Sequence, residues 1–163
     1  MSKIGFVILG LSISFSVFCQ KKEIYHPEAD AKNDISEAIE TAKRENKFVL
    51  LQGGGNWCKW CLEFYRFCKE DKAIDSVIES NFIWYHLNYS KENKNELLFK
   101  KYGLPQRFGF PVFIILDQLG NRIHTQDSGL LEDGKESYDK EKVLNFLSKW
   151  TPQALDSSTY IKK

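Results

Sequence analysis

The chain has 163 residues, of which 42% are hydrophobic and 14% aromatic, and this is enough for the packed core of one domain. Its 23 basic residues nearly balance its 22 acidic residues. Because a dedicated nucleic-acid surface shows a basic excess, the charge balance argues against a nucleic-acid partner. No internal repeat in the sequence suggests a second domain.

The first segment, residues 1–19, has the pattern of an export signal peptide. Lys3 supplies a positive start, and residues 4–18 are apolar or small and carry no charge. This run is shorter than the roughly 20 residues of a membrane span, and it has the length of the apolar core of a secretory signal. We therefore predict an exported protein and place it in the bacterial periplasm.

Three fates of this signal stay open. Cleavage after Cys19 would release a soluble protein that begins at residue 20. Lipid modification of Cys19 would instead anchor the protein, although Phe18 occupies the position where that processing normally takes Gly, Ala or Ser. An uncleaved signal would also act as an anchor. A membrane is therefore expected as a partner only in the second and third cases.

A helix follows a lead-in at residues 20–32. Asp34 and Glu37 resemble a capping box, in which a polar side chain and an acidic residue three positions later satisfy backbone N–H groups at a helix start. Apolar residues then recur at helical spacing. The pattern predicts a helix over residues 34–46.

A buried strand and a second helix come next. The continuous apolar run at residues 48–51 predicts a strand covered on both faces, and the three glycines at residues 53–55 should end it. Apolar residues at helical spacing then predict a second helix that begins at the motif Trp57-Cys58-Lys59-Trp60-Cys61. The motif therefore lies at the junction between a buried strand and the helix that follows it.

The later elements alternate in the same way and end in an antiparallel pair. They are, in order, a helix at 71–80, a strand at 82–89, a helix at 95–102, strands at 112–116 and 122–125 around a turn at 118–121, and a helix at 139–150. This order predicts an α/β architecture, with a central mixed β-sheet flanked by helices in a single domain at residues 33–151. Residues 152–163 are expected to be a polar tail.

The chemistry of the chain is expected at Cys58 and Cys61. At a helix start, unsatisfied backbone N–H groups and the helix dipole favour an anion, which lowers the pKa of the first thiol and raises its thiolate fraction. The second cysteine lies about one turn later, within reach of a disulfide and more deeply buried. Cys58 is therefore the candidate nucleophile and Cys61 the candidate resolving thiol.

Other uses of this cysteine pair are disfavoured. A zinc site needs further ligands, and the chain has no second cysteine pair and no histidine at zinc-ligand spacing from the motif. Haem attachment needs a histidine where Leu62 stands. A purely structural disulfide across so small a loop would constrain the unfolded chain little. We expect no metal and no cofactor besides the redox-active Cys58–Cys61 disulfide, and we expect Cys68 to be a buried structural thiol rather than a third redox thiol.

Residues 47–120 resemble the thioredoxin superfamily, particularly its small exported bacterial members. Four features carry the resemblance: the strand that leads into the Trp-Cys-x-Trp-Cys motif, the Leu87-Asn88 end of the next strand, Gly109-Phe110-Pro111, and the hairpin from Leu116-Asp117 to Gly120. The resemblance implies a thioredoxin fold and a thiol–disulfide oxidoreductase activity.

The resemblance also implies how a substrate would bind. In the family, the proline that corresponds to Pro111 is cis and faces the cysteines, and the backbone just before it, here Phe110, pairs with an extended substrate segment. From the residues themselves, Trp57, Trp60 and Phe108 could join Phe110 in an apolar rim that grips unfolded or extended polypeptide. The alternative is that some of these rings only pack under the motif loop, and we expect Trp60 to be exposed.

Gln52 departs from the family pattern. Many thioredoxins have a buried Asp here as the proton acceptor for the second cysteine, and Gln cannot take a proton. The usual Lys partner on the adjacent strand corresponds to His86, which could act as a base, although a histidine that merely packs in the sheet is the favoured interpretation. Lys59 is a further candidate modulator of the Cys58 thiolate, and an exposed lysine would contribute little.

Two functions of different classes fit these residues. The first is a thiol–disulfide oxidoreductase of the cell envelope, a monomer whose partners are protein thiols and disulfides and an unidentified redox partner. The second is a non-catalytic, chaperone-like binding module that holds a partner on its aromatic rim. The intact cysteine pair favours the first function, whereas Gln52 and the bulk of Trp60 slightly favour the second. The direction of electron flow stays open.

Overall fold

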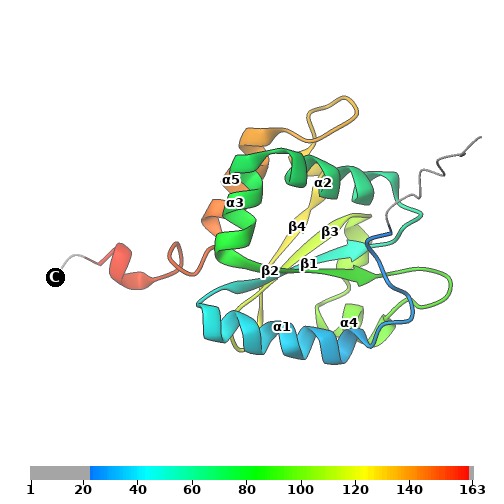
Figure 1. The fold of residues 1–163 in the computed structure, drawn as a ribbon, viewed down its shortest axis with the longest axis horizontal. Helices are drawn as coiled ribbons and strands as arrows, with labels where there is room; N and C mark the ends of the chain where they lie inside the picture. Colours follow the sequence, from blue (N-terminus) through cyan, green and yellow to red (C-terminus); the bar gives the residue numbers. More distant parts are fainter. Residues whose placement is uncertain (1–22, 162–163) are drawn as a thin grey trace, which may run out of the picture.

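Figure 1 shows the computed structural model of the protein, which describes residues 23–161. The export signal expected at residues 1–19 lies outside the described residues. The elements in chain order are α1 (Ala31–Glu45), β1 (Phe48–Gly54), α2 (Lys59–Glu70), α3 (Lys72–Asn81), β2 (Phe82–Asn88), α4 (Glu96–Lys101), η1 (Pro105–Phe108), β3 (Val112–Leu116), β4 (Arg122–Asp127), η2 (Ser128–Leu131), α5 (Lys140–Lys149) and η3 (Ser157–Thr159). Within this range, no helix is both long enough and apolar enough to span a membrane.

The four strands form one mixed sheet in the order β2-β1-β3-β4. β1 runs parallel to β2 and antiparallel to β3, and β4 pairs antiparallel with β3. Helices α2, α3 and α5 cover one face of the sheet, and α1 and α4 cover the other (Figure 1). The predicted α/β architecture, a mixed sheet flanked by helices, is confirmed.

The core follows the alternation of side chains along the central strand β1. Phe48 and Leu50 pack in the cluster beneath α2, α3 and α5, whereas Val49 and Leu51 pack in the cluster beneath α1 and α4. Every residue of β1 is buried. The continuous apolar run is therefore explained by burial on both faces of the strand.

β1 extends further than its apolar run. The glycines were expected to end the strand, but Gly53 and Gly54 still pair with Leu87 and Asn88 of β2. A strand ladder needs only backbone groups, and the missing side chain of Gly53 lets the ring of Phe99 approach closely. The strand therefore carries its pairing up to the loop that precedes the cysteines.

Helix α1 begins one turn earlier than the sequence predicts. Its N-cap is Asp30, whose carboxylate accepts a hydrogen bond from the backbone N–H of Asn33 at 3.1 Å. The predicted cap, Asp34, instead accepts a hydrogen bond from the Tyr85 hydroxyl at 2.9 Å. The capping-box interpretation was wrong because Asp34 already lies inside the helix and has a tertiary partner.

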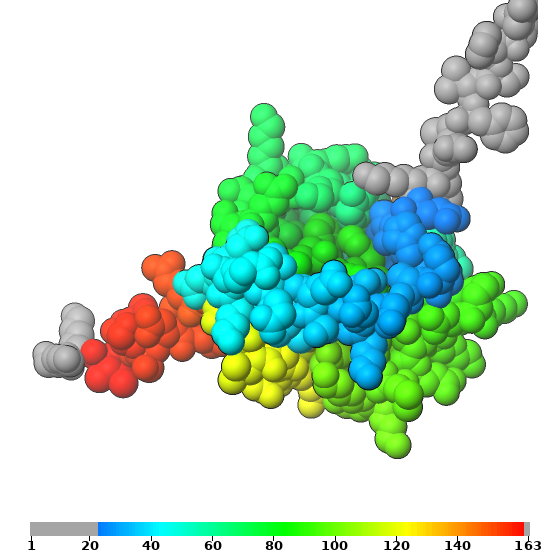
Figure 2. Space-filling model, turned by 60° about the horizontal axis from the view of Figure 1, so that its bottom comes forward, coloured from blue at the N-terminus to red at the C-terminus, as the bar shows by residue number. Residues whose placement is uncertain are grey.

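The two ends of the described chain differ in how closely they pack against the domain. Ile24 and Tyr25, in the lead-in before α1, are buried. Figure 2 shows α1 lying across the molecule, with the C-terminal segment standing away from the body on the opposite side from the lead-in. The lead-in is thus part of the packed structure, whereas Tyr160 and Ile161 near the C-terminus are exposed.

Candidate redox site

Cys58 and Cys61 form a disulfide at the start of α2, with their Cα atoms 5.2 Å apart. Cys58 is the N-cap of the helix, and its Sγ accepts a hydrogen bond from the backbone N–H of Cys61 at 3.1 Å. Cys58 keeps 5% of its surface exposed and Cys61 none. An N–H group that points at the outer sulfur stabilises negative charge there, so a thiolate on Cys58 is favoured once the disulfide is reduced.

Trp57 is exposed but held in a fixed position. Its side chain is 60% exposed, and its indole N–H donates a hydrogen bond to the carbonyl oxygen of Tyr89 at 2.8 Å. The ring meets Phe110 edge to face, with 5.6 Å between the ring centroids. Trp57 therefore offers an apolar surface beside Cys58 at little cost in side-chain entropy.

The expectation that Trp60 is exposed was wrong. Trp60 is half-buried, and its ring meets Tyr138 edge to face at 5.6 Å. The Tyr138 hydroxyl donates a hydrogen bond to the Trp60 carbonyl oxygen at 3.1 Å. The cause is the loop before α5, which packs against the first turn of α2 and covers the ring. Of the two tryptophans, Trp57 is the one available to a substrate.

Phe110 and Pro111 lie beside the disulfide. The peptide bond between them is cis. Phe110 is half-buried and packs against the cluster that contains Cys58 and Cys61, and Pro111 is buried. The structure thus brings together the Trp57–Cys61 motif and Phe110 from two separate parts of the chain.

Gln52 and His86 are register partners on β1 and β2 beneath the start of α2. Gln52 is fully buried and donates a hydrogen bond from Nε2 to the Cys61 carbonyl oxygen at 2.9 Å. Burial lowers the pKa of His86 to about 4, so its imidazole is neutral at pH 7 and is a weak base. His86 packs against the rings of Tyr25, Tyr65 and Trp84, in keeping with a histidine that packs in the sheet.

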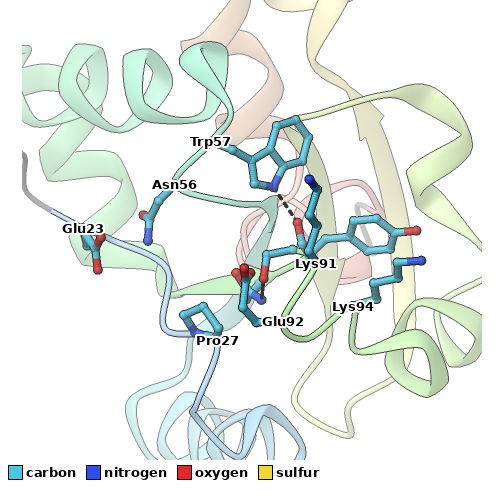
Figure 3. Close-up of a pocket in the computed structure, with 10 residues that line it drawn as sticks. Glu23, Pro27, Asn56, Trp57, Lys91, Glu92 and Lys94 are labelled. Carbon is cyan, nitrogen blue, oxygen red and sulfur yellow. Dashed lines mark hydrogen bonds between the residues drawn. The ribbon is translucent and has the colours of Figure 1, made fainter.

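A hollow of about 510 Å³ opens on the other side of Trp57. Figure 3 shows the Trp57 indole above it, Asn56 and Pro27 on one side, Lys91 and Lys94 on the other, and Glu92 between them. The lining therefore joins an aromatic face to a rim of both charges. Such a hollow suits a polypeptide side chain with an apolar body and a polar end.

Residues 30–118 match the model of a protein family described as thioredoxin-like. This match covers more than half of the chain and includes the disulfide. The chain belongs to the thioredoxin-like family. A comparison with curated proteins found no match.

Solved structures share the thioredoxin-like fold of this chain. A disulphide isomerase from Xylella fastidiosa Temecula1 is 24% identical, with a TM-score of 0.67 over 77% of this chain and 94% of that chain. The oxidised C-terminal domain of DsbD from Neisseria meningitidis is 18% identical, with a TM-score of 0.52 over 72% and 94% of the respective chains. A thioredoxin from Thermus thermophilus is 17% identical, with a TM-score of 0.50 over 70% and 81%. At these identities the likeness concerns the fold.

Two residues of the thioredoxin-like site escaped the sequence analysis, Tyr25 and Asn56. Tyr25 is fully buried in the same cluster as Cys58 and Cys61, and Asn56 holds it there through hydrogen bonds to the lead-in backbone. The apolar pair Ile24-Tyr25, set among charged and polar residues, was the signal available in the sequence.

Lys59 and Cys68 are the two remaining candidate residues. Lys59 is exposed on the first turn of α2. Cys68 is a free cysteine, fully buried in the cluster beneath α2, and burial raises the pKa of its thiol; both findings agree with a structural thiol. Between residues 23 and 161, no group of three His, Cys, Asp or Glu side chains is placed to hold a metal ion.

Proposed function

We propose that this thioredoxin-like protein is a thiol–disulfide oxidoreductase that exchanges disulfides with protein substrates in the cell envelope. The observation that carries the proposal is the asymmetry of the pair: Cys58 is the helix N-cap, with an N–H group directed at its sulfur, and Cys61 is fully buried beneath it. The first arrangement favours a nucleophilic thiolate, and the second keeps the resolving thiol away from solvent.

The proposed exchange takes place in two successive thiol–disulfide exchange steps. The Cys58 thiolate attacks one sulfur of a substrate disulfide, forms a mixed disulfide and expels the other substrate sulfur as a thiolate. The Cys61 thiolate then attacks Cys58 Sγ, which forms the Cys58–Cys61 disulfide and expels the second substrate thiolate. The substrate gains two electrons and the pair loses two. The same steps in reverse oxidise a dithiol substrate, and an unidentified redox partner restores the starting state.

Trp57, Phe110 and the hollow beside Trp57 are proposed to hold the substrate polypeptide. Trp57 offers a fixed, exposed aromatic face next to the attacking sulfur, and Phe110 precedes Pro111 on the other side. An extended segment laid along this surface would present its disulfide to Cys58. Trp60, which is packed against Tyr138, supports the motif from behind.

The proposed site of action, the cell envelope, rests on the export-signal pattern of residues 1–19. An envelope location supplies protein disulfides as substrates, because disulfides persist in oxidising compartments. The protein is proposed to act there as a monomer, in soluble form after cleavage or on the membrane if Cys19 is lipidated or the signal is retained.

Trapping the mixed disulfide tests this proposal. Cys61→Ala removes the resolving thiol, so envelope proteins should accumulate in disulfide-linked complexes with Cys58, visible on non-reducing gels and lost on reduction. Cys58→Ser should trap nothing. Cys68→Ala is the matched control, because it removes a buried thiol outside the pair and should leave trapping by Cys61→Ala unchanged. Absence of complexes with Cys61→Ala would contradict the proposal.

One observation favours a second candidate, a non-catalytic binding module. Trp57 is 60% exposed beside a hollow that could hold a polypeptide side chain without any redox step. In that case Cys58→Ser would bind a partner as well as the wild type does, and Trp57→Ala would not.

A further inference from the structure

The lead-in before α1 is fastened to the redox motif by a single side chain. Asn56 Oδ1 accepts hydrogen bonds from the backbone N–H groups of Ile24 and Tyr25, each at 3.1 Å, and Asn56 Nδ2 donates to the Tyr25 carbonyl oxygen at 2.8 Å. Asn56 lies two positions before Cys58. Tyr25 is therefore held in place by the same loop that carries the nucleophile.

The Tyr25 hydroxyl and the sulfur of the inner cysteine, Cys61, both border the position that a Gly54 side chain would occupy. A Cβ atom placed on Gly54 would collide with Cys61 Sγ and would lie 2.7 Å from Tyr25 Oη. Both atoms thus border the same small space, which stays open because residue 54 has no side chain. Tyr25 is fully buried, so no solvent competes for its hydroxyl there.

The hydrogen bonds of Gln52 determine whether the Tyr25 hydroxyl is free to donate a hydrogen bond. Gln52 Nε2 donates to the Cys61 carbonyl oxygen at 2.9 Å and to Tyr25 Oη at 2.8 Å. A carbonyl oxygen can only accept, so the amide must turn its NH₂ group toward Cys61 and Tyr25. Tyr25 Oη accepts from this group and keeps its own proton to donate.

We propose that Tyr25 donates a hydrogen bond to the Cys61 thiolate and so promotes the step in which Cys61 resolves the mixed disulfide. In that step the Cys61–Cys58 bond forms, the bond from Cys58 to the substrate breaks, and the substrate sulfur leaves with the electron pair. Tyr25 keeps its proton throughout. This role rests on the proposed oxidoreductase function.

The surroundings of Cys61 explain why such a donor is needed. A fully buried thiolate is costly unless it is hydrogen-bonded, and Gln52 already directs its NH₂ group to the carbonyl oxygen and to Tyr25. Besides the two thiols, the titratable side chains in contact with this cluster include Tyr25 from the lead-in, Tyr65 from α2 and His86 from β2, and Tyr138 acts on Tyr25 electrostatically. Burial raises the pKa of Tyr25, so the phenol stays protonated as a donor, and the pKa of His86, lowered to about 4, leaves the imidazole neutral.

Tyr25 lies outside the part of the chain that matches the family model. The family match begins at residue 30, after Tyr25. The donor thus comes from a segment that precedes α1 and is held beside the cysteines by hydrogen bonds to Asn56 and Gln52.

The two steps can be observed separately when the protein, with its Cys58–Cys61 pair first reduced, reacts with the aromatic disulfide dithiobis(nitrobenzoate). Attack by Cys58 releases one coloured thiolate, and resolution by Cys61 releases a second. In Tyr25→Phe the first release should keep its rate, and the second should slow by about tenfold at pH 7, with its pH midpoint raised by about one unit. Tyr102→Phe is the matched control, because Tyr102 is buried in the α1–α4 cluster away from the pair and its hydroxyl has no partner among the described residues; neither release should change.

The outcomes separate this proposal from the function on which it rests. A second release with the wild-type rate and midpoint in Tyr25→Phe would overturn the role of Tyr25 and leave the oxidoreductase function standing. A wild-type protein that shows no second release would overturn the function itself. If Tyr25→Phe does not fold, Asn56→Ala tests the same step, because it frees the lead-in while leaving the phenol in place. The second release should slow there too, and an unchanged second release would contradict the proposal.

Discussion

Two regions beneath α2 differ in how they are built. The first, here called the sandwich core, is the apolar cluster around Phe64, Leu50 and Phe113. The second, here called the redox end, consists of Tyr25, Gln52, Gly54, Cys58, Cys61 and His86. The sandwich core consists mainly of apolar side chains in contact with one another, and at its edge one polar atom, Trp84 Nε1, is buried without a hydrogen-bond partner among the described residues. In the redox end, Gln52 Oε1 and His86 Nε2 are buried without a hydrogen-bond partner among residues 23–161.

This difference indicates that the redox end lowers the stability of the fold. A buried polar atom without a partner costs about 1–3 kcal/mol, whereas buried apolar surface stabilises the fold. The sandwich core therefore offsets the cost of the redox end.

The largest effect is expected in the sandwich core. Phe64 is fully buried, with its ring centroid 4.3 Å from that of Phe113 and 4.9 Å from that of Tyr138. Phe64→Ala should lower the free energy of unfolding by about 3–5 kcal/mol, because it leaves a cavity among these rings. Phe108→Ala, which truncates a 40% exposed ring, should change it by less than about 0.5 kcal/mol. Chemical denaturation measures both, and equal losses would contradict the account.

The two tryptophans of the motif should separate stability from substrate binding. Trp60→Ala should cost about 2 kcal/mol of stability, because the half-buried ring packs on Tyr138. Trp57→Ala should leave stability within about 0.5 kcal/mol and raise the KM for a disulfide-containing polypeptide by about fivefold, which corresponds to about 1 kcal/mol. Denaturation and steady-state kinetics distinguish the two variants. The reverse assignment of effects would mean that Trp60 is the substrate-facing ring.

The redox end should make stability depend on pH through His86. The unfolded chain protonates this histidine near pH 6.5, but the folded protein resists protonation until about pH 4. Stability from neutral His86 is therefore present above about pH 6.5 and is lost as the pH falls toward 4, with a slope of up to about 1.4 kcal/mol per pH unit.

A variant pair isolates this contribution from that of the carboxylates. His86→Gln should flatten the fall in unfolding free energy between about pH 6.5 and 4, measured by denaturation at a series of pH values. Phe108→Ala, which truncates an exposed ring and changes no titratable group, should keep the wild-type slope. An unchanged slope in His86→Gln would show that the histidine is not held neutral by burial.

Local patterns were sufficient to predict the sandwich core. Apolar runs and helical spacing predicted the strands and helices of the sheet and its layers, because these patterns depend on neighbours a few residues away. The expected pairing of Gln52 with His86 is confirmed by the register of β1 and β2. The same reasoning misplaced the start of α1, since Asp30 and Asp34 are equally good caps by residue type and only tertiary contacts separate them.

The redox end could be predicted only in part, because it is built by contacts between distant parts of the chain. Tyr25 reaches the motif through Asn56 and Gln52, which lie 31 and 27 positions away along the chain. Trp60 is covered by Tyr138, which is 78 positions away. No local pattern encodes such contacts. The cysteine pair was therefore predicted, but the residues that pack against the motif, Tyr25 and Tyr138, were not.

The measurement that tests the central claim most directly is the redox equilibrium of the Cys58–Cys61 pair. The protein would be equilibrated in dithiothreitol or glutathione buffers of graded potential, and the disulfide fraction counted by thiol alkylation and mass spectrometry. We predict one reversible two-electron transition that disappears in Cys61→Ala. A potential near about −270 mV would mark a reductase, and one above about −180 mV an oxidase or isomerase. A pair that forms no reversible disulfide would contradict the account and leave the binding module as the function.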